Sequence, residues 1–150
     1  MTLFGRALLM ASDEELAERM LQEATTKRPV DPLAFYYLAE AAEHREHLDV
    51  ARQALVDYRT IEGDDREPRR RAALDERIAD LSLRLNDAPG AVNWFQKAAE
   101  IQALEAGPLV RYAEALWKAG NAEAARAALT RALEKEPGSA AAKAMARVIK

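Results

Sequence analysis

The sequence contains no cysteine. Disulfide bonds, thiolate zinc sites and cysteine nucleophiles are therefore excluded. This absence does not select a compartment, because a chain without thiols is compatible with both reducing and oxidising surroundings. Histidine is almost as scarce, since His44 and His47 are the only two in 150 residues.

The chain also lacks the short motifs that most often carry catalysis or phosphate binding. Its six glycines form no phosphate-binding loop and no nucleophile elbow. Ser12 and Ser139 are interpreted as helix caps, and Ser82 lies in a helical pattern with no histidine nearby in the sequence. We therefore expect no catalytic residue, no cofactor and no enzymatic activity.

Long apolar runs are absent as well, and none approaches the length that crosses a membrane. The only candidate targeting segment is the N-terminal stretch MTLFGRALLMASDEEL. Its apolar part is short, interrupted by Arg6 and followed by acidic residues, so we interpret it as a folded helix. Membrane insertion is not expected. Without a recognisable signal peptide or spanning segment, a cytoplasmic location is slightly favoured.

Neither sign of charge dominates the chain. Lysine and arginine number 22 against 25 aspartates and glutamates, which gives a formal net charge of −3. This near-balance argues against a general binder of nucleic acid, because affinity for phosphates rises with the number of cationic contacts. Apolar residues make up 49% of the chain, which is enough for a hydrophobic core and is not typical of disorder.

Helical periodicity dominates the composition that is present. In AFYYLAEAAEH, the residues Phe35, Leu38 and Ala42 recur at steps of three and four, the pattern of an amphipathic helix. No stretch shows sustained alternation of β-branched residues, so no sheet is expected. The pattern predicts an all-α protein.

The six prolines fall between the helical patterns and never inside one. Because proline costs about 3 kcal/mol inside a helix, these positions mark helix boundaries. A capping box at 12–15, N-caps at Asp31 and Ser139, and a left-handed turn at Gly120 and Asn121 agree with them. The predicted helices are 2–11, 13–27, 32–45, 48–61, 67–86, 89–103, 107–119, 122–135 and 139–149.

Small residues recur with a fixed period. Ala17 and Ala51 are 34 residues apart, and so are Ala91 and Ala125, whereas 40 residues separate Ala51 from Ala91. A period of 34 residues with paired helices is typical of one class of helical repeat, here with six extra residues between the second and third units.

In these positions the chain resembles the tetratricopeptide repeat family. The pattern has a pair with a small residue in the first helix, and then a small, a large and another small residue in the second. The last unit carries it at Tyr112-Ala113, Leu116, Ala125, Leu129, Ala132 and Pro137. The first unit carries it at Phe4-Gly5, Leu8, Ala17, Leu21, Ala24 and Pro29, and the third at Ile78-Ala79, Ala91, Phe95 and Ala98. The second has Leu38-Ala39, Ala42, Ala51 and Leu55, and departs with Tyr58 in the small position. The alternative is a helical bundle whose alanines follow helix propensity alone, but propensity has no reason to keep one phase over four units.

The resemblance implies a right-handed α-solenoid of antiparallel helix pairs, formed by one array over residues 1–150. Its predicted parts are a truncated unit at 1–30, full units at 31–64, 72–105 and 106–138, an insertion at 62–71 and a capping helix at 139–150. Small residues at the closest helix contacts, with large neighbours beside them, would let the units stack. Because the chain starts within a first helix, we expect a piece of a longer array or an open end that packs on a partner.

Two charged clusters have alternative interpretations. Arg66, Arg69, Arg70 and Arg71 of the insertion form either a nucleic-acid patch or, as we favour, a solvated helix start beside its own acids. His44 and His47, with Glu40 and Glu43 one turn back, either hold a divalent metal or, as we favour, are exposed turn residues. We therefore expect no metal site.

The resemblance also implies where a partner binds, because first helices line the binding groove of this family. Transferred by position, the groove residues are Tyr36, Tyr37, Glu40, Arg77, Asp80, Arg111, Glu114, Trp117 and Lys118. Aromatic residues and arginines are typical of binding hot spots, although packing of the tyrosines and Trp117 between units is an open alternative. The lysine and asparagine clamp of the family's chaperone cofactors is absent, because Tyr37 and Glu40 occupy its asparagine positions.

The predicted function is a non-catalytic scaffold or adaptor that binds a peptide or partner helix of another protein in this groove. The alternative is a self-associating or structural segment of a larger protein, with homo-oligomer formation as its consequence.

Overall fold

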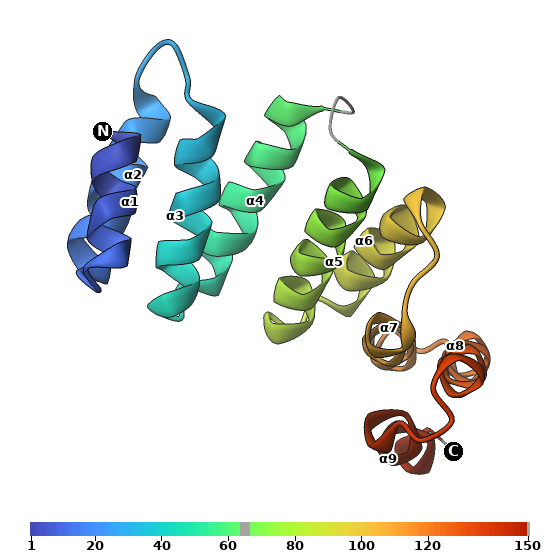
Figure 1. Cartoon of the computed structure of the whole chain (residues 1–150). Helices are drawn as coiled ribbons and strands as arrows, with labels where there is room; N and C mark the ends of the chain where they lie inside the picture. Colours follow the sequence, from blue (N-terminus) through green and yellow to red (C-terminus); the bar gives the residue numbers. More distant parts are fainter. Residues whose placement is uncertain (64–66, 150) are drawn as a thin grey trace. The chain divides into compact units, whose positions relative to one another are not determined.

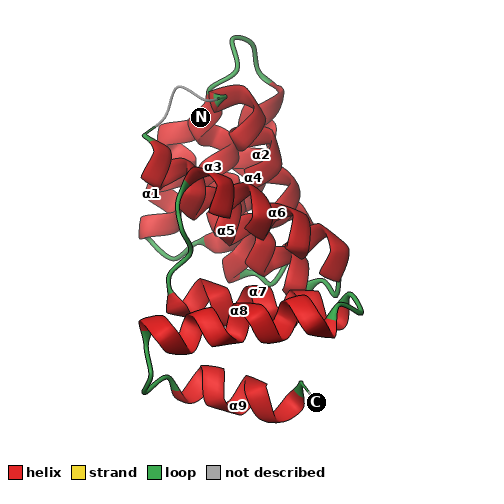
Figure 2. Ribbon diagram, turned by 90° about the vertical axis from the view of Figure 1, so that its right-hand side faces the viewer, coloured by secondary structure: helices red, strands yellow, loops and turns green. Residues whose placement is uncertain are grey.

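The computed structural model describes residues 1–63 and 67–149. Within these ranges the chain forms helices joined by short loops, with no strand (Figure 2). The helices are α1 Thr2–Met10, α2 Glu14–Thr26, α3 Pro32–His44, α4 Leu48–Glu62, α5 Pro68–Arg84, α6 Ala88–Ile101, α7 Ala106–Lys118, α8 Ala122–Lys135 and α9 Ala140–Val148. Each predicted boundary lies within two residues of the observed one. The prediction of an all-α fold built from consecutive helix pairs is confirmed.

The chain divides into two compact units, Met1–Arg66 and Glu67–Lys150. In the first unit, α1 packs on α2 and α3, and α3 packs on α4. In the second unit, α5 packs on α6 and α7, α7 packs on α8, and α9 lies against both α7 and α8 (Figure 1). Arg66 and Lys150, at the ends of the predicted insertion and capping helix, lie outside the described residues, as do positions 64 and 65.

One turn geometry recurs between the two helices of every pair. Ser12, Glu46, Asn86 and Gly120 all have a positive φ, between 59° and 87°. At each turn the residue after the positive φ donates its N–H to a carbonyl five residues back, as Asp13 does to Leu8 and Asn121 does to Leu116. This is the Schellman arrangement, which reverses the chain tightly. The four turns keep the same 34-residue spacing as the alanines, so backbone and side chains repeat in the same phase.

Most of the predicted caps are present, and one is wrong. Asp31 accepts a hydrogen bond from the N–H of Leu33, and Ser139 accepts one from the N–H of Ala142. The predicted capping box at Ser12 is not formed, because Ser12 takes the left-handed conformation that turns the chain. The cap of α2 is Asp13, whose side chain accepts from the N–H of Leu16.

The small residues of the repeat lie at buried helix contacts. Ala17, Ala51, Ala91 and Ala125 are completely buried, and Leu21, Leu55, Phe95 and Leu129 beside them are buried too. At Gly5 the contact is so close that an added Cβ would lie 2.5 Å from Leu21 Cγ. Close approach of two helices therefore requires these small residues, and the large neighbours fill the adjoining space.

The two departures from the repeat have structural consequences. Tyr58, in a position that is small in the other units, is buried and has its ring 5.4 Å from the ring of Tyr36. After the insertion, α5 begins at Pro68 as predicted and extends over 17 residues. Arg69 and Arg70 in its first turn are exposed, and Arg70 Nε lies 3.7 Å from Glu67 Oε2. The described part of the insertion is thus a solvated helix start beside its own acid.

Candidate functional site

The candidate site is the surface of α3, α5 and α7 that carries the residues predicted to line a groove. We call this surface the first-helix face, because each of these helices is the first of its pair. Tyr36, Tyr37 and Glu40 belong to the first compact unit, and Arg77, Asp80, Arg111, Glu114, Trp117 and Lys118 belong to the second. The two parts are described separately.

In the first unit, the two tyrosines are half-buried and lie edge to face, with ring centroids 5.7 Å apart. The Tyr37 ring also faces α1, where the Arg6 guanidinium lies 5.5 Å from its centroid. Tyr36 instead contacts Tyr58 of α4 and so contributes to packing within the unit. Of the two, Tyr37 has the environment of a binding residue, because a guanidinium over an aromatic ring forms an amphipathic surface.

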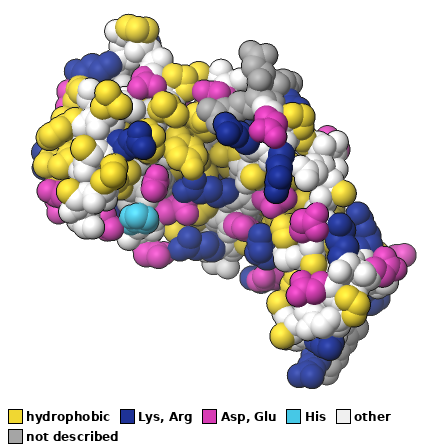
Figure 3. All heavy atoms as spheres, viewed as in Figure 1, with side chains coloured by type: hydrophobic (Ala, Val, Ile, Leu, Met, Phe, Trp, Pro, Cys, Tyr) yellow, Lys and Arg dark blue, Asp and Glu magenta, His cyan; other side chains and the backbone are white. Residues whose placement is uncertain are grey.

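Apolar side chains surround this part of the face. Leu3, Phe4 and Met10 of α1 have exposed fractions of 78%, 54% and 80%. Figure 3 shows hydrophobic side chains gathered over α1 and α3, whereas charged side chains of both signs alternate over α5 and α7. The first unit therefore offers a more apolar surface than the second.

In the second unit, two predicted groove residues pair with each other. Arg111 Nε on α7 donates to Asp80 Oδ1 on α5 at 2.6 Å, and both side chains remain partly exposed. The pair links the two first helices of this unit. Arg111 is therefore not an unengaged cation, and a ligand carboxylate that binds it must compete with Asp80.

Glu76 of α5 lies beside this pair and was not among the predicted site residues. Burial raises the pKa of the Glu76 carboxyl, Arg111 acts in the opposite direction, and the nearby Asp80 and Glu105 raise the pKa further. Three carboxylates are thus grouped around one guanidinium. This arrangement favours an additional positive group, whether a proton or a basic ligand side chain.

The remaining predicted residues lie at the C-terminal end of α7, apart from Arg77, which is half-buried on α5. Lys118 Nζ and Glu114 Oε1 form an ion pair of 2.7 Å one helical turn apart. Trp117 between them is 38% exposed. An exposed tryptophan beside a charged pair is a typical anchor for a protein partner.

A polar cluster in the first unit was missed by sequence reasoning. The carboxylate of Glu18 on α2 is buried, and it accepts a hydrogen bond from Arg45 Nη1 at 2.8 Å and contacts His47 Nδ1 at 2.9 Å. It holds the turn between α3 and α4 against α2. The equivalent positions in the other units are Arg52, Val92 and Arg126, so the repeat pattern carried no signal for a buried acid.

Both histidines contact acidic side chains of α2. His44 Nδ1 lies 3.2 Å from Glu14 Oε1, and His47 is held by Glu18 as described above. Among residues 1–63 and 67–149, no group of three or more histidine or carboxylate side chains is arranged to hold a metal ion. In the same ranges, no helix combines the length and the apolar character that crossing a membrane requires.

Comparisons with known proteins show the fold. No protein-family model matches the chain, and no curated protein sequence does either. Among solved structures, YrrB, a TPR protein described as having an unusual peptide-binding site, matches with a TM-score of 0.79 at 17% identity, over 97% of this chain and 72% of that one. MamA matches with a TM-score of 0.70 at 16% identity, over 89% of this chain and 69% of that one.

The chain of the Cut9–Hcn1 complex that matches is much longer. Its TM-score is 0.73 at 15% identity, and the match covers 98% of this chain but only 29% of that chain. At such low identities the likeness concerns the backbone alone. The 34-residue phase of the small residues, the recurring turn and these matches agree, and the chain has the tetratricopeptide repeat fold.

Proposed function

We propose that this chain is a non-catalytic protein-interaction module, a scaffold or adaptor that binds a peptide or partner helix on its first-helix face. The observation that carries the proposal is the presence of partly exposed Tyr37 and Trp117 on first helices, each next to charged side chains. Aromatic side chains in such settings dominate the energetics of protein interfaces. The fold supports the proposal, because YrrB, which shares it, is described as having a peptide-binding site.

The charges of the second unit favour a ligand that carries both signs. A ligand carboxylate at Arg111 displaces Asp80, and the displaced Asp80 together with Glu76 then faces the ligand as negative charge. A basic group on the same ligand compensates for this charge. A purely acidic ligand lacks this compensation.

The aromatic anchors are tested with a partner captured from a cell lysate and then purified. Tyr37→Ala and Trp117→Ala should each weaken binding by about 1–2 kcal/mol, as loss of an aromatic hot spot does. Thermal melts of both variants should be recorded beside the titrations. If affinity and stability fall together, the aromatic packs within the protein and the proposal fails at that residue.

The charged part of the face is tested with Arg111→Gln and its matched control Arg70→Gln. Glutamine is preferred to glutamate at 111, because a carboxylate there would face Asp80 and perturb the fold. Arg111→Gln should weaken partner binding, and the loss should shrink as salt is raised, whereas Arg70→Gln on the first turn of α5 should have no effect. The reverse result would place the partner on the insertion.

Self-association is the second candidate function, and the exposed apolar face of α1 favours it. Leu3, Phe4 and Met10 are the most exposed large apolar residues of the first unit, and such patches often mark interaction surfaces. Sedimentation velocity over a range of concentrations tests this candidate. A concentration-dependent dimer that Met10→Lys abolishes would support it, and a monomer at every concentration would exclude it.

A further inference from the structure

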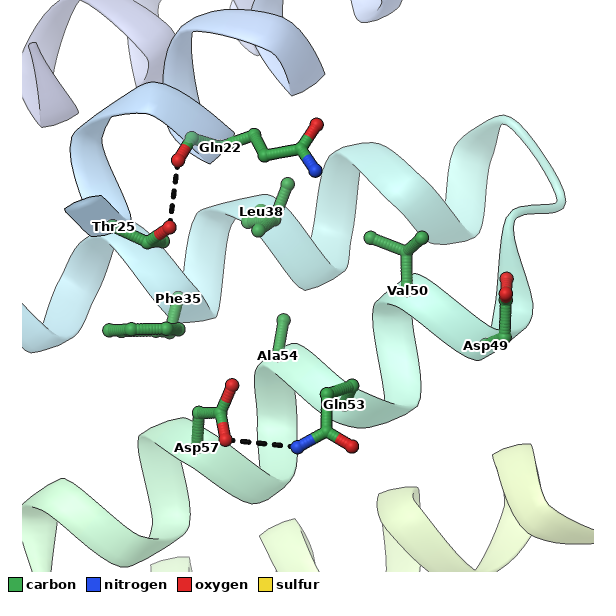
Figure 4. A pocket seen from close by; sticks show the side chains of 9 residues that line it. All are labelled: Gln22, Thr25, Phe35, Leu38, Asp49, Val50, Gln53, Ala54 and Asp57. Carbon is green, nitrogen blue, oxygen red and sulfur yellow. Dashed lines mark hydrogen bonds between the residues drawn. The ribbon is translucent and has the colours of Figure 1, made fainter.

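A second surface of the first unit has the form of a binding groove. It is a pocket of about 320 Å³ between α2 and α4, and its floor is formed by α3 (Figure 4). Phe35 and Leu38 of α3 line the floor together with Val50 and Ala54 of α4. The pocket thus has an apolar floor that accepts an apolar side chain.

The rim of the pocket is acidic. Asp49 and Asp57 of α4 line it, and the lining residues include no lysine or arginine. Because the two aspartates are eight residues apart on one helix, they are separated by about 12 Å along its axis at a rise of about 1.5 Å per residue. The chemistry of the rim favours a ligand with two positive groups at that spacing.

Side-chain amides supply hydrogen-bonding groups on both sides. Figure 4 shows Gln22 of α2 and Gln53 of α4 on opposite sides of the floor. Gln53 Nε2 donates to Asp57 Oδ1 at 3.0 Å, which uses one of its two N–H groups. An extended peptide can pair its main-chain N–H and C=O groups with such amides, whereas a helix has already used its own.

The groove continues beyond this pocket toward the end of α4. A second pocket of about 260 Å³ shares Thr25, Phe35 and Asp57 with the first and extends to Val30 and Ile61. The surface is therefore an elongated groove along α4. Its length suits a chain segment better than a small molecule.

We propose that this groove binds an extended segment of a partner protein in which an apolar side chain is flanked, two residues away on each side, by lysine or arginine. The apolar side chain lies on Phe35, and the two cations face Asp49 and Asp57. Four residues of extended chain span about 13 Å at about 3.3 Å per residue, which matches the separation of the two carboxylates.

This surface is distinct from the first-helix face and goes beyond the function proposed above. Phe35 faces α2 and α4, whereas Tyr37 lies under Arg6 of α1. Two sides of the same helix therefore serve two surfaces. A variant on one side can be tested without touching the other.

The test uses the full chain and a fluorescein-labelled peptide, Gly-Arg-Ser-Leu-Ser-Arg-Gly, followed by fluorescence anisotropy. We expect saturable binding that weakens as salt is raised. A peptide with serine in place of leucine, and one with both arginines changed to glutamate, should each bind about tenfold more weakly or worse, since each loses the apolar or the electrostatic contribution. Absence of saturable binding by the arginine peptide would overturn the proposal.

A charge swap makes the test specific to this groove. The double variant Asp49→Lys with Asp57→Lys should lose the arginine peptide about tenfold and gain affinity for the glutamate peptide. A merely structural role of the aspartates would not produce this exchange. Circular dichroism checks that the variant is folded, and the milder Asp49→Asn with Asp57→Asn, expected to lose affinity for the arginine peptide without gaining the glutamate peptide, replaces it if it is not.

Tyr37→Ala is the control for the other surface, and it should leave peptide binding unchanged. If Tyr37→Ala abolishes binding while the charge swap has no effect, the peptide binds the first-helix face and the groove proposal is wrong. If both variants leave binding unchanged, neither surface binds this peptide. In that case the groove proposal fails, while the first-helix face keeps its own test with the captured partner.

Discussion

At the scale of single residues, the fold depends on small side chains at the closest helix contacts. Ala125 of α8 is completely buried, whereas Ala127, two residues later on the same helix, is exposed. The same substitution at the two positions therefore separates a packing effect from a helix-propensity effect. Both parent residues are alanines, so the pair is closely matched.

Ala125→Leu should destabilise the protein by about 1–3 kcal/mol, because the larger side chain overpacks a close contact. Ala127→Leu should be nearly neutral. Denaturant unfolding curves of the two variants measure both effects. Equal shifts would show that the register of α8 against its neighbours is not the one described here.

Glu76 gives a residue-scale prediction with a defined sign. Its pKa is raised above the ordinary value of 4.5, so between 4.5 and the raised pKa the folded state holds a proton that the unfolded state releases. The stability from this group is therefore complete below pH 4.5 and is lost as the pH rises through the raised pKa.

Glu76→Gln removes the ionisation while it keeps the shape of the side chain. The melting temperature of this variant should exceed that of the wild type at pH 7 to 8, and the difference should shrink at pH 4. Thermal melts at both pH values provide the measurement. A difference that is the same at both, or that grows toward pH 4, would contradict the assignment.

At the scale of elements, the recurring turn of each pair requires one residue with a positive φ. Gly120 meets this requirement without strain, but Ser12 adopts a φ of 61° with a Cβ attached. The left-handed conformation costs such a residue about 1–2 kcal/mol, whereas glycine adopts it freely and pays instead in conformational entropy.

Ser12→Gly should consequently stabilise the protein by about 0.5–1 kcal/mol, the balance of those two effects. The neighbouring Ala11 has a φ of −88°, so Ala11→Gly should give no such gain and serves as the control. Chemical denaturation of both variants tests this. A gain at 11 as large as the gain at 12 would mean that the turn is not as described.

At the scale of the whole molecule, we propose that residues 1–150 form one repeat array, in which each unit is stabilised by its neighbours. Trp94 and Trp117 are the only tryptophans, and both belong to the second compact unit. Tryptophan fluorescence therefore reports on that unit alone, whereas far-ultraviolet circular dichroism reports on all helices.

If the array unfolds as one cooperative unit, the two signals should follow the same curve in denaturant. Coincident midpoints within error are the expected result. A fluorescence transition that separates from the circular dichroism transition would show that Met1–Arg66 and Glu67–Lys150 unfold independently.

The sequence by itself determined the helices and the fold. The spacing of apolar residues, the prolines between helices and caps such as Asp31 are local signals, and each acts within a few residues of the position that it sets. The phase of Ala17, Ala51, Ala91 and Ala125 added the pairing of helices, because close helix contacts need small residues wherever they recur.

Only the tertiary structure decided which side chains meet across helices. Arg111 pairs with Asp80, 31 residues earlier, and Glu18 receives Arg45, 27 residues later. The groove over Phe35 likewise joins residues of α2, α3 and α4. A repeat pattern places backbones, but the polar partners of each unit are specific to it, and their meeting depends on how long side chains extend between packed helices.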